Sequence, residues 1–110
     1  MTHEAVKRMI EDIGLPYAYD RFPQKAAPGG PPFICFLYTH SDNFSADGVV
    51  YQRIEALRIE LYTDVKDPEL EKRVADALTA AGLCYDRDED YIEAERMHMT
   101  VFSTEILLTD

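Results

Sequence analysis

The sequence lacks long apolar runs and has few basic residues, and each shortage excludes a class of function. No apolar run approaches the roughly 20 residues that a helix needs to cross a bilayer, and Met1–Glu4 shows no signal-peptide pattern. We therefore expect a soluble, cytosolic protein without a membrane partner. The chain has 11 Lys and Arg against 21 Asp and Glu, for a formal net charge of -10. Such a surface repels phosphate backbones, so no specific nucleic-acid binding is expected, although DNA could slide past it.

Clustered cysteines and histidines are also lacking. Cys35 and Cys84 both lie in apolar or strand-like segments, which predicts two reduced, buried thiols rather than a disulfide. The three histidines are far apart and have no metal-binding spacing. No nucleophile-and-base motif and no phosphate-binding loop is present. The sequence thus predicts no catalytic residue, no cofactor, no metal and no enzyme activity.

The acidic stretch Asp86–Asp90 places carboxylates at alternate positions, as a calcium loop does. A calcium loop of the EF-hand type also needs Gly at its sixth position and Glu at its twelfth. Counted from Asp86, these positions hold Tyr91 and Met97. The stretch is therefore predicted to be a solvated acidic turn.

The local signals predict one α+β domain over residues 1–110, with a mostly antiparallel or mixed sheet, a long hairpin and two helices packed on the sheet. Apolar residues at helical spacing predict helices over Thr2–Ile13 and Pro68–Ala81. Asp67 is the expected N-cap of the second helix, and Glu71 is expected to matter little for its stability. Pro16–Phe22 is a candidate short strand, and Leu83–Tyr85 is expected to start another.

The hairpin from Phe33 to Thr63 is the centre of the prediction. Phe33–Tyr38 is an apolar run typical of a strand covered on both faces. Leu57–Tyr62 alternates, as a strand with one buried face does. Ile54 and Ala56 have the opposite parity to Leu57, so a bulge or bend near Glu55 is expected.

The hairpin also carries the residues predicted to form a subunit interface. Its loop holds Phe44 among turn-forming residues, and an aromatic side chain within a polar rim is typical of an interface anchor. Phe44 folding back onto the sheet is the alternative. The second strand mixes charges of both signs, which lets it meet another copy without net repulsion. The predicted interface residues are Asp42, Asn43, Phe44, Asp47, Arg53, Glu55, Arg58 and Glu60.

Several phrases along the chain resemble one family. They are Gly14-Leu15-Pro16 with Tyr17-Ala18-Tyr19, Pro32-Phe33-Ile34, Ser41-Asp42-Asn43-Phe44 with Ala46-Asp47, Val50-Tyr51, Glu60-Leu61-Tyr62-Thr63-Asp64 with Lys66-Asp67-Pro68-Glu69-Leu70-Glu71, and Tyr91-Ile92-Glu93. With these the chain resembles the small tail-terminator and tail-completion (head–tail joining) proteins, often called minor capsid proteins, of long-tailed phages and prophages of Gram-positive bacteria.

The resemblance implies a structural protein of the virion tail or neck that is made in the host cytoplasm. It implies a ring, of six copies, that caps the tail tube and joins it to the head. The implied partners are other copies of the chain, the tail tube protein and the neck or head-completion proteins. Two alternatives stay open: a head-completion or adaptor protein of the neck, and a small α+β ligand-binding domain or enzyme.

Overall fold

The computed structural model describes residues 1–24, 26–46 and 48–110, with the backbone alone at residues 44–46, 50 and 51. Along the chain run α1 (His3–Glu11), β1 (Tyr17–Tyr19), β2 (Phe33–Ser41), β3 (Phe44–Ala46), β4 (Val49–Thr63), α2 (Pro68–Ala80), β5 (Asp86–Ile92) and β6 (Met97–Leu108). The strands join in the order β1-β2-β4-β6-β5, with β3 paired to β4. The β1–β2 pair is parallel, and the other pairs are antiparallel. The predicted α+β fold with its long hairpin is confirmed.

Both helices begin after the predicted N-cap residues, and α2 ends one residue before the predicted Ala81, whereas α1 ends at Glu11, two residues before the predicted Ile13. The Thr2 hydroxyl accepts a hydrogen bond from the amide of Ala5 at 3.0 Å, and the Asp67 carboxylate accepts one from the amide of Leu70 at 3.2 Å. These side chains satisfy amides that have no partner within the first turn. Gly82 follows α2 with φ +76°, a left-handed conformation that ends helices at little cost for glycine.

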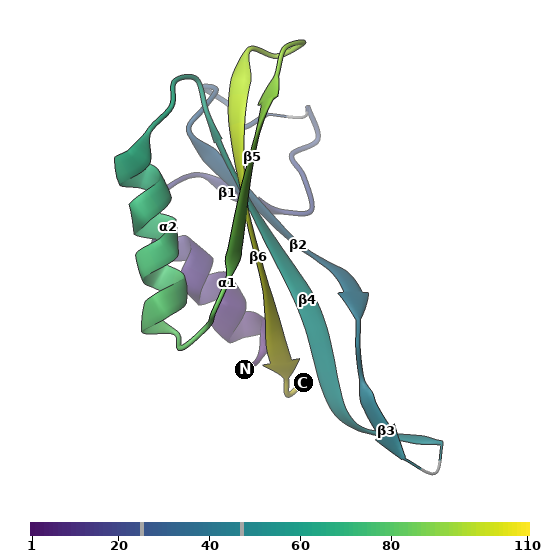
Figure 1. Cartoon of the computed structure of the whole chain (residues 1–110). Coiled ribbons are helices and arrows are strands. Elements are labelled where there is room, and N and C mark those ends of the chain that lie inside the picture. The colour runs from purple at the N-terminus through teal and green to yellow at the C-terminus, as the bar shows by residue number, and fades with distance from the viewer. Residues whose placement is uncertain (25, 47) are drawn as a thin grey trace.

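The two helices cover the same face of the sheet (Figure 1). Their apolar stripes meet the sheet residues that point toward them, so the main core lies between helices and sheet. The fully buried members are Val6, Ile10, Val74 and Leu78 from the helices and Ile34, Phe36, Leu57, Ile59, Leu61, Phe102 and Ile106 from the strands.

The opposite face of the sheet is covered only in part. The proline-rich loop after β1 crosses it beside the upper half of the sheet (Figure 1). Ala27 and Phe22 of this loop pack with Phe33, Cys35 and Met97 in a second, smaller core. Burial on both faces explains the unbroken apolar run at the start of β2. Phe22 therefore does not point the same way as Tyr17 and Tyr19, which pack against Phe36 on the helix side.

The bulge expected near Glu55 lies instead on the neighbouring strand. Tyr38 pairs with Leu57 and His40 with Ala56, so Thr39 is the extra residue. β4 keeps one parity from Arg53 to Thr63, with Glu55 buried on the helix side together with Leu57. The sequence prediction was wrong here because it assumed that a charged residue would not occupy the buried parity.

Three further expectations are wrong. Asp86–Asp90 forms most of β5, an edge strand, and is not a turn. Strand β5 begins at Asp86, after the Leu83–Tyr85 segment that was expected to start it. Cys84 is exposed, whereas Cys35 is buried as predicted, and both are free thiols.

Glu71, which was expected to matter little for stability, is a further correction. Only 5% of it is exposed, and its carboxylate lies 2.6 Å from Lys66 Nζ and 2.8 Å from Arg87 Nη1. Ala81, the last residue of the predicted second helix, is exposed and is the C-cap of α2. Neither helix of the described chain is long and apolar enough to cross a membrane.

Candidate subunit interface

One part of the sheet projects beyond the rest of the molecule. We call residues 42–46 and 48–52 the arm: β3 pairs there with the first residues of β4, after β2 has ended and beyond the last β6 pair, Arg53 with Leu108. Figure 1 shows the arm extending away from both helices, and the molecule measures 49 × 27 × 22 Å. Within the described residues no third strand joins this ribbon. A two-stranded ribbon on its own is marginally stable in water, so the arm is suited to meet a partner.

The predicted residues Asp42 and Asn43 lie at the root of the arm and hold its backbone. The amide of Asp42 donates to the carbonyl of Ile54 at 2.8 Å. The amide of Ile54 donates to Asn43 Oδ1 at 3.1 Å. The Asn43 side chain thus replaces a ladder hydrogen bond where β2 gives way to β3.

Arg53 and Glu55 also lie at this root, on the helix side. Glu55 is 8% exposed. Its carboxylate accepts a 2.7 Å hydrogen bond from the Ser41 hydroxyl and forms an ion pair with Arg53 at 3.4 Å. Arg53 also donates to the carbonyl oxygen of Asp110. These contacts satisfy the buried carboxylate and tie the arm to the C-terminal residue.

Arg58 and Glu60 lie on the opposite face, since odd and even residues of β4 point to opposite sides. Arg58 Nε is 2.7 Å from Glu60, and the Tyr62 hydroxyl donates to Glu60 at 2.9 Å. Burial, together with this hydrogen bond, raises the pKa of Tyr62. The four charged residues predicted as one series are therefore divided between two faces.

The remaining two predicted residues are Phe44 and Asp47. The backbone of Phe44 pairs with Gln52. The side chain of Phe44 and all of Asp47 lie outside the part of the chain that the structure describes. Of the eight predicted residues, the structure thus brings together Asp42, Asn43, Arg53 and Glu55.

Sequence reasoning missed an aromatic cluster beside the arm. The rings of His3, Tyr19 and Tyr38 lie 5.6–5.8 Å apart, and His3 Nδ1 is 2.7 Å from the Tyr38 hydroxyl. They line an open cavity of about 560 Å³, which we call the aromatic notch; its other lining residues are Arg53, Glu55, Leu108 and Asp110. Burial raises the pKa of Tyr38 to about 12. No local pattern could reveal the notch, because its three aromatic residues come from α1, β1 and β2.

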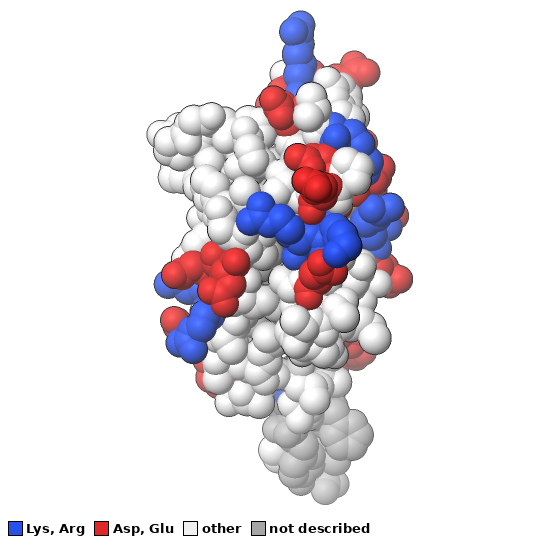
Figure 2. Space-filling view, turned by 90° about the vertical axis from the view of Figure 1, so that its left-hand side faces the viewer, with Lys and Arg blue, Asp and Glu red and all other residues white. Residues whose placement is uncertain are grey.

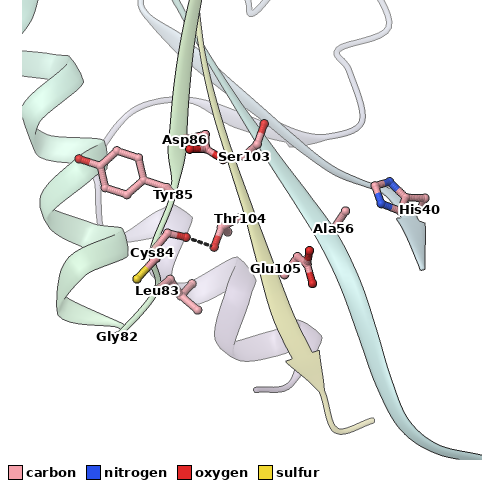
Figure 3. Close-up of a pocket in the computed structure, with 10 residues that line it drawn as sticks. All are labelled: His40, Ala56, Gly82, Leu83, Cys84, Tyr85, Asp86, Ser103, Thr104 and Glu105. Atoms are coloured by element: carbon pink, nitrogen blue, oxygen red, sulfur yellow. Dashed lines mark hydrogen bonds between the residues drawn. The ribbon is translucent and has the colours of Figure 1, made fainter. Parts of the chain in front are cut away.

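A second hollow, of about 480 Å³, lies beside β6 and the segment that leads into β5. Figure 3 shows small residues, Ala56 and Ser103, between His40 and Asp86, while the Thr104 hydroxyl donates to the carbonyl of Cys84. The same view places Cys84 and His40 at opposite ends of the hollow. They are therefore not arranged as a nucleophile with its base.

Charges of both signs lie side by side over the upper part of the helix-bearing side (Figure 2). Lys66 bridges Glu71 and Glu89, and Arg87 binds Glu71. The hydrogen bond from Lys66 lowers the pKa of Glu89. These ion pairs join α2 to β5, so this region stabilises the fold.

No family model matches the sequence, and no curated protein matches it. Among solved structures, the fold is similar to that of a chain in the virion of a native gene transfer agent particle, with a TM-score of 0.62 and 15% sequence identity. The similar region covers 90% of this chain and 82% of that chain. At this identity the likeness is one of fold, and it extends over nearly the whole molecule.

Proposed function

We propose that this protein is a structural component of a phage-like virion, a tail terminator whose copies form a ring that caps the tail tube and joins it to the head. The observation that carries the proposal is the arm, a projecting ribbon to which no third strand of the described chain adds. The fold likeness to a chain of a gene transfer agent virion supports the same role. So does the sequence resemblance to phage tail-terminator proteins.

The site geometry favours assembly over catalysis. The described cavities are open, and their thiol and histidine do not face each other. The aromatic notch has the Tyr and Arg content that is enriched in interface hot spots. Small-molecule sites are instead mostly enclosed and apolar.

A ring also accounts for the charge of the chain. In a ring, one patch of a subunit meets a different patch on the next, and the rotation closes, here after six copies. A net charge of -10 keeps the surface from holding DNA that passes through the ring. The arm and the notch are two different patches on one molecule, as such a contact needs.

Phe44→Ala tests the role of the arm. We expect tail completion and ring formation to be impaired, while circular dichroism shows an unchanged fold. The matched control is Tyr91→Ala, which removes an aromatic ring that is 45% exposed on β5, away from the arm. Normal assembly by Phe44→Ala would remove the arm from the interface, and a wild-type protein that never completes tails would refute the terminator role.

A further inference from the structure

The outer edges of the sheet differ in charge. β5 forms one edge, and five of its seven residues, Asp86–Asp90, are charged. Charged side chains on an edge strand discourage pairing with another chain. This edge is therefore protected against adding a strand.

The outer edge of β2 is open and uncharged beyond Phe36. β1 pairs with β2 from Ile34 to Phe36, and the amide of Asp20 donates the last hydrogen bond, to the Phe36 carbonyl at 2.7 Å. Asp20 then turns the chain away, with φ +68°. Past this point no described residue pairs with the outer side of Tyr38–Ser41, a stretch without acidic or basic residues apart from His40.

A second uncharged edge lies on the arm. Val49–Gln52 of β4 continues past Arg53, the last residue that pairs with β6. On that side nothing in the described ranges pairs with it. The stretch reads Val-Val-Tyr-Gln, which combines high strand propensity with the absence of charge.

The two uncharged edges face opposite ways, because β2 and β6 flank β4 on opposite sides. We propose that the Val49–Gln52 edge of one copy pairs with the Tyr38–Ser41 edge of the next copy and extends its sheet. Such a head-to-tail contact repeats from copy to copy, which is the requirement for a ring. The inference deepens the proposed terminator function and rests on it, since it names the edges that join neighbouring subunits.

Two neighbouring features support this pairing. The aromatic notch opens beside the β2 edge, and Tyr19 there is 49% exposed. In strand addition, main-chain hydrogen bonds give affinity and such pockets take alternate side chains of the incoming strand. The far end of β6 offers no competing edge, because Met1 bonds there to the Leu107 carbonyl at 2.7 Å and to the Thr109 amide at 3.0 Å.

Charge at the arm edge is the first test. Val49 is 54% exposed, so Val49→Lys leaves the fold intact but places a charge on the pairing edge. We expect it to weaken self-association at least about tenfold, a difference of roughly 1.4 kcal/mol. Val49→Thr, which stays uncharged and β-branched, and Asp88→Lys on β5 are the controls, and both are expected to associate as the wild type does. Equal association of Val49→Lys and Val49→Thr would overturn the pairing.

Cross-linking between two variants that each carry one reactive cysteine is the second test. Cys84→Ser removes the exposed thiol, and Cys35 stays unreactive because burial raises its pKa to about 11 and the thiolate is the nucleophile. In this background, Val49→Cys mixed with His40→Cys is expected to give a dimer with a short bismaleimide. Val49→Cys mixed with Asp88→Cys is the control and is expected to stay unlinked.

The outcomes separate this inference from the proposed function. Cross-linking to Asp88→Cys instead of His40→Cys would overturn the strand pairing, while a ring that still completes tails would leave the terminator role standing. Absence of any cross-link at high concentration would overturn self-pairing by these edges. Cross-linking as expected by a protein that does not act in tail completion would refute the terminator role and leave the strand pairing standing.

Discussion

Glu71 gives the sharpest test of the energetics of this fold. This residue of α2 is almost fully buried, and its carboxylate binds both Lys66 and Arg87. We predict that Glu71→Ala lowers the free energy of unfolding by about 2–3 kcal/mol. A hydrogen bond to a charged group contributes roughly 1.5–3 kcal/mol.

The estimate stays below the 3–5 kcal/mol typical of breaking a fully buried pair. The side chains of Lys66 and Arg87 are 43% and 49% exposed, so water can solvate both after the carboxylate is removed. At roughly 4 °C per kcal/mol for a domain of this size, the melting temperature falls by about 8–12 °C.

Urea unfolding followed by circular dichroism measures this effect, and a cycle with Arg87→Ala isolates the pair. We expect the double variant to be clearly more stable than the sum of the two single losses predicts. Asp76→Ala is the control, because its partner Lys72 lies on the solvent side of α2 with its side chain 75% exposed. Identical midpoints for Glu71→Ala and Asp76→Ala would refute the buried position of Glu71.

Three further predictions follow from burial and strand geometry. Leu78→Ala removes a side chain with no exposed surface and is expected to cost about 2–5 kcal/mol in thermal or urea unfolding, whereas a change at the exposed Thr79 is expected to have little effect. Calcium or chelator is expected to leave the melting temperature unchanged, because alternate carboxylates on a strand such as Asp86–Asp90 lie roughly 6.6–6.8 Å apart; a rise of several degrees with calcium contradicts this. Burial raises the pKa of Cys35 from 9.0 to about 11, so its contribution to stability is complete below pH 9 and is lost as the pH rises to about 11. The urea midpoint of Cys35→Ala is therefore expected to fall less than that of the wild type between pH 9 and about 11. An equal fall with pH in variant and wild type would contradict this role of Cys35.

Local signals were sufficient for the elements that depend on neighbouring residues in the chain. Asp67 and Gly82 bound α2 because capping is decided within one turn. Phe33–Tyr38 and Leu57–Tyr62 pair as predicted, since apolar content and alternation reflect burial directly. The α+β fold could therefore be predicted from the sequence.

The errors on charged residues arise because contacts distant in the chain decide the surroundings of those residues. Glu71 is buried because Lys66 and Arg87 compensate it, and Arg87 comes from another element. β5 is a strand although it is almost wholly charged, because an edge strand has one neighbour and its side chains meet water. The long hairpin was predicted, but the aromatic notch required the folded arrangement of His3, Tyr19 and Tyr38.

The central claim is that copies of this chain close into a ring, and its most direct test is the mass of the purified protein. Light scattering coupled to size-exclusion chromatography measures that mass over a range of concentrations, alone and with tail tubes. We predict a discrete closed species of six times the 12.6 kDa chain mass. A protein that stays at 12.6 kDa under all these conditions would contradict the claim.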